Sequence, residues 1–232
     1  MMGVLFLLTL SCRNRTWRRL LSALPSQIMS QEKINTITVY CASSNSVDGH
    51  FQSCAEDLGR HMAERNLQLV YGGGSVGLMG VIARTLQQNG GKVTGVITRR
   101  LVSAEQLYDK CDETIIVDSM RERKAIMAQR GDAVIVLPGG VGTLEEFFEI
   151  LVGRLVGEHE MPIAVVNVEG YFDPLLNMLD HVVEEGFAKP AIRKLFLVTD
   201  NPVEAVEAML QGRGEMTPDD SMLPSGSAEI SS

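Results

Sequence analysis

The 232-residue sequence has few of the residues on which disulfide scaffolds and metal sites depend. It holds one tryptophan, four histidines and four cysteines. The cysteines, at positions 12, 41, 54 and 111, form no CxxC pair and have no metal-ligand spacing with the histidines. We therefore expect reduced thiols, no metal, no cofactor and a cytoplasmic protein.

The chain also lacks a membrane-spanning run and a surplus of basic residues. The apolar stretch Met1–Leu10 is far shorter than the roughly 20 residues that a spanning helix needs. Net charge is −8, and the four arginines within residues 1–31 leave the rest of the chain at −12. An acidic body repels a nucleic-acid backbone. Neither a membrane nor a nucleic acid is expected as a partner.

The composition predicts three regions. Residues 1–31 are an N-terminal extension, either an incorrectly assigned start, with Met29 as the true first residue, or an arginine-rich presequence. Residues 32–210 have the length and pattern of one domain. Residues 211–232 are rich in Ser, Pro, Gly and Asp and have no apolar period, so a disordered tail is expected.

Short apolar runs alternate with helical patterns inside the domain. Strands are expected at 34–40, 67–71, 92–97, 114–117, 132–137, 162–167 and 195–198, and helices at 49–65, 77–88, 120–130, 143–156, 172–185 and 202–210. Such apolar strands, alternating with helices, are typical of a parallel sheet covered on both faces. The sequence predicts an α/β, Rossmann-like, doubly wound, mostly parallel sheet in a single domain. Ligands of such folds bind beyond the carboxyl ends of the strands, where strand order reverses.

The glycine-rich segment Gly72–Gly80 joins an expected strand to an expected helix. Its glycines at positions 72, 74 and 77 satisfy the GxGxxG pattern of dinucleotide sites. The acidic residue that holds the ribose in those sites is missing, because the next strand ends in Thr98-Arg99-Arg100. Arginines there suit a phosphorylated ribose, which leaves an NADP-dependent oxidoreductase open. The other interpretation is a tight turn that simply requires glycine.

A second glycine-rich segment, Pro138–Glu146 (PGGVGTLEE), follows the expected strand at 132–137. It lacks the Gly-Lys-Ser/Thr of a Walker loop. Its glycines would expose several main-chain amides at a helix N-terminus, where an anion binds readily. Alternatively, Thr143 and Glu146 form a capping box that serves only their own helix.

Two cations interrupt the apolar face of the helix expected at 120–130. On a helical wheel Arg123 falls between Met127 and Ile126, and Lys124 lies next to Met127. A buried cation needs an anionic partner. That partner is either a structural carboxylate or a ligand phosphate, for which arginine offers a bidentate fork.

Together these segments resemble the Lonely Guy (LOG) family of cytokinin-activating enzymes, over nearly all of residues 34–210. Pro138–Glu146 matches the family's PGGxGTxxE, Met120–Lys124 its M-x-x-R-K, and Gly72–Gly80 its second glycine loop. The sequence departs from the family at Arg121, where His is frequent, at Val141, where an aromatic residue or Gly is frequent, and at Thr98, where Pro is common.

The resemblance implies hydrolysis of the N-glycosidic bond of cytokinin riboside 5′-monophosphates, which are N6-substituted adenosine monophosphates, to free base and ribose 5-phosphate. It implies Glu146 as the catalytic carboxylate, Arg123 as the residue that grips the substrate or leaving group, and a homodimer. The substrate-binding residues that it implies are Arg123, Lys124, Gly139, Gly140, Val141, Gly142, Thr143, Gly74 and Ser75. A general purine or pyrimidine nucleotide nucleosidase and a non-catalytic nucleotide-binding protein are the alternatives. The apolar face of the helix at 143–156 (Phe147, Phe148, Leu151, Leu155) permits packing in a dimer or in the core.

Overall fold

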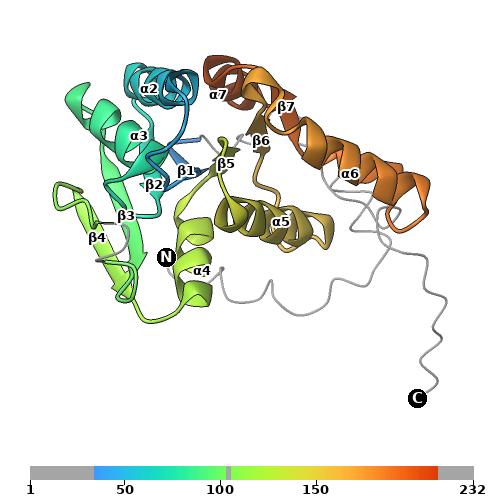
Figure 1. Ribbon diagram of the computed structural model, residues 1–232, viewed down its shortest axis with the longest axis horizontal. Helices are drawn as coiled ribbons and strands as arrows, with labels where there is room; N and C mark the ends of the chain where they lie inside the picture. The colour runs from blue at the N-terminus through green and yellow to red at the C-terminus, as the bar shows by residue number, and fades with distance from the viewer. Residues whose placement is uncertain (1–33, 103–105, 214–232) are drawn as a thin grey trace, which may run out of the picture. The chain divides into compact units, whose positions relative to one another are not determined.

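The computed structural model describes residues 34–102 and 106–213 (Figure 1). Its strands are β1 (Thr36–Tyr40), β2 (Gln68–Tyr71), β3 (Val93–Thr98), β4 (Glu113–Val117), β5 (Ala133–Val136), β6 (Ile163–Val166) and β7 (Leu197–Thr199). Its helices are α2 (Gly49–Glu64), α3 (Gly77–Gln88), α4 (Met120–Arg130), α5 (Val141–Leu155), α6 (Asp173–Glu184) and α7 (Pro202–Leu210), with short 3-10 turns η1 (Val168–Gly170) and η2 (Pro190–Lys194). The extension at 1–31 and the tail beyond 213 lie outside the described residues, so the predicted division of the chain stays a prediction.

The described strands form one sheet with the order β4-β3-β2-β1-β5-β6-β7, and every pairing is parallel. The chain begins in the middle of the sheet, builds outward through β2 to β4, and then returns to build the other half from β5. Strand order therefore reverses between β1 and β5, which pair along Ile37–Tyr40 and Ala133–Val136. The predicted doubly wound fold is confirmed.

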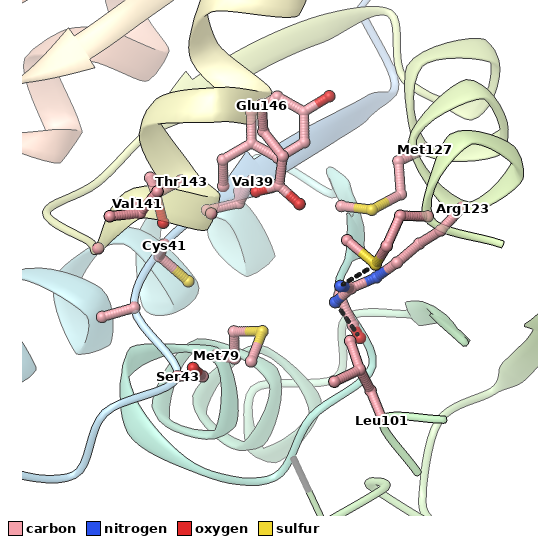
Figure 2. Close-up of a pocket in the computed structure, with 16 residues that line it drawn as sticks. Val39, Cys41, Ser43, Met79, Leu101, Arg123, Met127, Val141, Thr143 and Glu146 are labelled. Atoms are coloured by element: carbon pink, nitrogen blue, oxygen red, sulfur yellow. Dashed lines mark hydrogen bonds between the residues drawn. The ribbon is translucent and has the colours of Figure 1, made fainter. Parts of the chain in front are cut away.

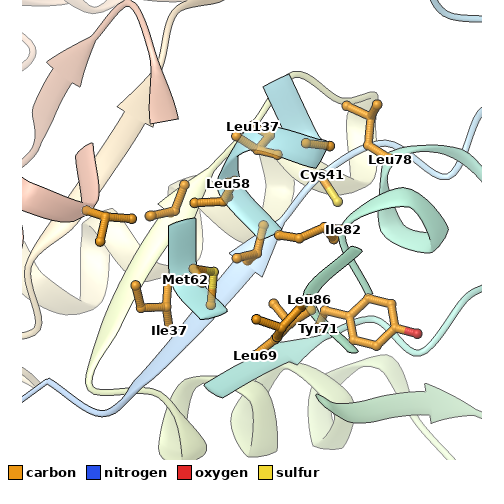
Figure 3. Packing of buried hydrophobic residues seen from close by; sticks show 14 of the residues in the cluster. Ile37, Cys41, Leu58, Met62, Leu69, Tyr71, Leu78, Ile82, Leu86 and Leu137 are labelled. Atoms are coloured by element: carbon orange, nitrogen blue, oxygen red, sulfur yellow. The ribbon is translucent and has the colours of Figure 1, made fainter. Parts of the chain in front are cut away.

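Helices cover both faces of the sheet, as the apolar strands require. Side chains of β1 alternate between the faces: Ile37 and Val39 join the cluster under α2, α3 and α7, whereas Tyr40 joins the cluster under α4, α5 and α6. Figure 3 shows the first cluster, in which Leu58 and Met62 of α2 meet the strands. No helix of the described residues is long and apolar enough to cross a membrane.

Two boundaries differ from the prediction in ways that matter. Helix α5 begins at Val141 with Gly140 as its N-cap, two residues before the expected start. Glycine is a poor helix former, which placed the expected start after Gly142. Strand β7 begins at Leu197 instead of 195, because residues 190–194 form η2.

Candidate active site

A cavity of about 270 Å³ opens where the carboxyl ends of β1 and β5 lie side by side. Its lining comes from the end of β1, from the loops after β1 and β5, from α4, from the first two turns of α5, and from Gly72, Met79 and Leu101. Figure 2 shows side chains from these distant segments converging on one space. This is the place at which doubly wound sheets bind their ligands.

The start of α5 forms one wall of the cavity. Gly140, Val141, Gly142 and Thr143 all line it. The Leu144 amide donates to the Gly140 carbonyl at 3.1 Å, so the three preceding amides come before the first bond of the helix. Gly140 has no side chain with which to cap them. The arrangement places main-chain donors and the positive end of the helix dipole at the cavity.

Thr143 is the third residue of α5 and not its N-cap. A capping box with Thr143 and Glu146 would need the helix to begin after Thr143. That alternative is therefore wrong. Thr143 is buried against Gly139 instead, while Glu146 lies one turn into the helix.

The glycines of this loop serve two different purposes. A Cβ on Gly139 would collide with the Thr143 side chain and would lie 3.0 Å from the Ala42 nitrogen, so close packing requires glycine there. A Cβ on Gly140 or on Gly142 would have nothing within 4 Å, and neither residue has a positive φ. The fold does not require glycine at those two positions. At both positions the backbone instead faces open space.

Glu146 brings a carboxylate to the cavity from α5, and in Figure 2 its carboxyl group points into the space. Tyr40, at the end of β1, lines the same cavity. Burial, followed by the nearby carboxylates of Glu146, Glu149 and Glu145, raises the pKa of the Tyr40 phenol. The phenol therefore keeps its proton at neutral pH and remains a hydrogen-bond donor beside the carboxylates.

Arg123 reaches the cavity from α4 and is only 4% exposed. Its Nε donates to the Val96 carbonyl at 3.0 Å, and its Nη2 donates to the Gly72 carbonyl at 2.8 Å. A Cβ on Gly72 would collide with the guanidinium, so glycine is needed there to admit the arginine. The sequence left open whether Arg123 pairs with a structural carboxylate or with a ligand phosphate. In the structure its guanidinium also donates to two buried main-chain carbonyls.

Four of the expected substrate-binding residues, Gly139, Lys124, Gly74 and Ser75, are not among those that line the cavity. Gly139 packs against the Thr143 side chain instead. Lys124 contacts the carboxylates of Glu145 and Glu149, so it ties α4 to α5. Gly74 forms an isolated bridge with Leu107. Ser75 donates its amide to the Gln106 carbonyl at 2.9 Å and accepts from Arg84 Nη1 at 2.8 Å.

The GxGxxG segment follows β2, one strand away from the point where strand order reverses. Two amides at the start of its helix are used inside the protein: Gly77 donates to Asn45 Oδ1 at 2.7 Å and Met79 donates to the Ala42 carbonyl at 3.3 Å. Gly77, at a φ of 57°, would bring a Cβ within 2.7 Å of the carbonyls of Ala42 and Ser44. The segment therefore supports the loop after β1, and its helix amides are not presented to a pyrophosphate.

Sequence reasoning missed part of the lining. Cys41, Ala42 and Ser43 belong to it because they directly follow β1. Their place after the first strand of a doubly wound sheet was the signal that could have identified them. A second missed set is an apolar wall made of Met79, Leu101, Met120 and Met127. Met79 and Met120 lie inside the two motifs, but no pattern in the sequence indicated that these four side chains line one cavity.

Comparison with known proteins adds the family. Residues 79–209 match the family model described as "Possible lysine decarboxylase". The chain is 40% identical over 179 residues to the probable cytokinin riboside 5′-monophosphate phosphoribohydrolase LOGL2 of Oryza sativa subsp. japonica, which covers 77% of this chain and 73% of that protein. It is 39% identical over 181 residues to the cytokinin riboside 5′-monophosphate phosphoribohydrolase LOG3 of Arabidopsis thaliana, with 78% and 84% covered.

A solved structure shares the fold. The molybdenum cofactor carrier protein of Chlamydomonas reinhardtii superposes with a TM-score of 0.59 at 20% identity, over 77% of this chain and 98% of that chain. The description of the family model as a decarboxylase finds no counterpart in the described lining, which includes no lysine. The relatives of about 40% identity and the family model together show that the chain belongs to the LOG family of cytokinin riboside 5′-monophosphate phosphoribohydrolases.

Proposed function

We propose that the protein hydrolyses the N-glycosidic bond of N6-substituted adenosine 5′-monophosphates, releasing the free base and ribose 5-phosphate. One observation carries the proposal. A single cavity combines the amides at the start of α5, which suit a phosphate, with the Glu146 carboxylate one turn along the same helix. Glu146 comes four positions after Gly142 on α5, a rise of roughly 6 Å, which leaves room for a ribose between phosphate and carboxylate.

The chemistry follows from this spacing. Cleavage of an N-glycosidic bond passes through an oxocarbenium-like sugar, which a nearby carboxylate stabilises. Glu146 faces that sugar and accepts a proton from the attacking water, whose oxygen bonds to the anomeric carbon as the bond to the base nitrogen breaks. The base leaves with the electron pair of that bond and takes up a proton from solvent to become the free base. The phosphate, anchored on Gly140–Thr143, holds the ribose in position, so its binding energy is used for orientation.

Arg123 presents a positive charge to the same cavity, and two carbonyl contacts fix its guanidinium. We assign to it the stabilisation of negative charge on the leaving base. Lys124 acts indirectly. By pairing with Glu145 and Glu149 it offsets part of the negative charge next to Glu146, which is the one of these three carboxylates that lines the cavity.

The apolar wall of Met79, Leu101, Met120 and Met127 favours a substrate whose N6 substituent is itself apolar. Incubating the protein with a panel of nucleoside monophosphates and scoring free base by chromatography tests this. We expect kcat/KM for N6-isopentenyladenosine monophosphate to exceed that for AMP by about 10- to 100-fold, since one or two side chains' worth of apolar burial separates the substrates.

Leu101→Ala should lower the ratio of kcat/KM for N6-isopentenyladenosine monophosphate to kcat/KM for AMP, because it removes part of the apolar wall. The half-exposed Leu210 of α7 offers the matched control, and Leu210→Ala should leave the preference unchanged. Equal rates for all purine and pyrimidine monophosphates would favour the general nucleosidase instead. Tight binding without release of any base would favour a non-catalytic nucleotide-binding protein.

We also infer a homodimer that packs through α5. Phe147 and Leu151 are buried in the core of their own chain, so they are not available to a partner. The exposed apolar residues of this helix and its C-cap are Val141, Phe148, Val152 and Val156, which recur at spacings of seven or four residues along one side. Light scattering is the test, and a monomeric mass at micromolar concentration would overturn the inference.

A further inference from the structure

One side chain outside the cavity lining holds the loop that carries the phosphate-binding amides. The hydroxyl of Tyr171 donates to the Gly139 carbonyl at 2.7 Å. Tyr171 lies in the turn between β6 and α6, and Gly139 lies in the turn between β5 and α5. Because β5 and β6 are neighbours in the sheet, the hydrogen bond joins two adjacent turns at its carboxyl edge.

The hydrogen bond from Tyr171 fixes the direction of the Gly140 N–H, which lies on the opposite side of the same peptide unit from the Gly139 carbonyl. A trans peptide unit is planar, so the N–H of Gly140 points opposite to the C=O of Gly139. Gly140 lines the cavity. A hydroxyl on the carbonyl side therefore keeps the Gly140 amide directed away from Tyr171, and accepting this bond also polarises that amide into a better donor.

The preceding peptide is held as well. The Ala42 amide donates to the Pro138 carbonyl at 3.1 Å, and the Thr143 side chain packs against Gly139. The loop is therefore fixed by β1 on one side and by Tyr171 on the other. Of these contacts, only the one from Tyr171 depends on a side-chain hydrogen bond that a conservative substitution can remove.

Tyr171 is itself firmly placed. Its ring meets Phe51 of α2 edge-on, with centroids 5.5 Å apart, and Phe172 with centroids 5.0 Å apart. Asn167 fixes the turn, since its side chain accepts from the Phe172 amide at 2.6 Å and donates to Asp173 at 2.8 Å. Glu169 adopts a φ of 50°, which is costly for a residue other than glycine and persists only where the surroundings enforce it.

We propose that Tyr171 is a positioning residue for the 5′-phosphate of the substrate: its hydroxyl, bonded to the Gly139 carbonyl, orients the Gly140 amide toward the phosphate. The proposal rests on the proposed function in placing the phosphate at the start of α5. Tyr171 touches neither the substrate nor the reacting atoms, and its effect passes through the peptide of Gly139 and Gly140.

Tyr171→Phe tests the proposal, because phenylalanine keeps the ring against Phe51 and removes only the hydroxyl. We expect the Kd for ribose 5-phosphate, measured by calorimetry, to rise about 3- to 10-fold, as the loss of one positioning hydrogen bond allows. The KM for the nucleoside monophosphate should rise by the same factor with little change in kcat. Affinity for the matching nucleoside, which has no phosphate, should stay the same, as should the melting temperature.

The matched control is Tyr108→Phe. The Tyr108 hydroxyl donates to Gln87 Oε1 at 2.9 Å, away from the cavity lining, so its loss should leave all ligand affinities unchanged. An unchanged Kd for ribose 5-phosphate in Tyr171→Phe would overturn the proposal, and so would equal weakening for nucleotide and nucleoside. If the wild-type protein binds ribose 5-phosphate but releases no base from any monophosphate, the proposed function fails, and the Kd comparison still decides the role of Tyr171.

Discussion

Glu146→Gln is expected to lower kcat/KM for the nucleoside monophosphate by about 10²- to 10⁴-fold, the range typical of a lost acid–base group. The amide has nearly the shape of the carboxylate, but it carries no charge to face the oxocarbenium-like sugar and accepts no proton from water. Affinity for ribose 5-phosphate should stay close to that of the wild type, because the amides at Gly140–Thr143 are untouched. Glutamine and glutamate have similar helix propensities, so α5 and the melting temperature should be unaffected.

The control for this substitution lies three residues along the same helix. Glu149 contacts Lys124 and does not line the cavity. Glu149→Gln removes the same charge from the same helix, and Lys124 keeps its contact with Glu145. Single-turnover release of base should therefore remain within about twofold of the wild type, as for an ordinary exposed ion pair. Near-normal turnover by Glu146→Gln would refute the assignment of the catalytic carboxylate.

Arg123→Ala provides the contrast, because here activity and stability should fall together. The substitution leaves the buried carbonyls of Val96 and Gly72 without their guanidinium donor, at a cost of about 1–3 kcal/mol for each buried group. Arg121→Ala, at an exposed position of the same helix, should change neither the activity nor the free energy of unfolding. Denaturant unfolding separates the two variants, and an unchanged free energy of unfolding in Arg123→Ala would contradict the structural part of its role.

The sequence was sufficient to predict the sheet because most of its strands are continuously apolar and are followed by a helical period; the strand at 114–117, which follows the strand at 92–97 with no helix between them, is the exception. The sequence was also sufficient to predict the side of the cavity that the start of α5 forms. The run of glycines before Thr143 and the position of Glu146 indicated an anion site beside a carboxylate, and the structure brings both to one cavity. The helix start was misplaced by two residues, because the low helix propensity of Gly142 is outweighed once Gly140 takes the N-cap position.

The sequence did not predict which neighbours the charged residues of α4 meet. A helical wheel puts Arg123 and Lys124 on the same side, but it cannot say which element lies beyond each. In the structure α4 packs against β1 to β4, so Arg123 reaches the Val96 carbonyl within β3 and the Gly72 carbonyl after β2, whereas Lys124 reaches Glu145 and Glu149 of α5. Likewise the GxGxxG pattern of Gly72–Gly80 could not show that its strand is one place away from the reversal of strand order, because strand order is a tertiary property.

Gly142→Ala is expected to weaken substrate binding while leaving the protein as stable as before, or more stable. An added Cβ would meet nothing within 4 Å, so the fold tolerates it without strain. Gly142 is the second residue of α5, and alanine is favoured over glycine in a helix by up to about 1 kcal/mol. The free energy of unfolding should therefore stay constant or rise. The same methyl group would enter open space beside the cavity that Gly142, Val141 and Thr143 line.

The methyl group added by Gly142→Ala should therefore remove much of the binding free energy of a doubly charged phosphate. Charge-assisted hydrogen bonds contribute about 1.5–3 kcal/mol each, so displacing the phosphate from one or two amides raises the Kd for ribose 5-phosphate by about 10- to 100-fold. The KM for the monophosphate should rise in parallel. Gly140→Ala should behave in the same way, since its Cβ would also enter open space beside the cavity.

Gly49→Ala is the matched control. Gly49 is the first residue of α2, it too has nothing within 4 Å of an added Cβ, and it does not line the cavity. Gly49→Ala should change the free energy of unfolding by the same small amount as Gly142→Ala and should leave the Kd for ribose 5-phosphate unchanged. Calorimetric titration with ribose 5-phosphate and thermal unfolding of the three variants measure both quantities. If Gly142→Ala and Gly140→Ala bind ribose 5-phosphate as the wild type does, the phosphate is not held at the start of α5, because no ligand oxygen could then depend on the space that the new methyl groups occupy.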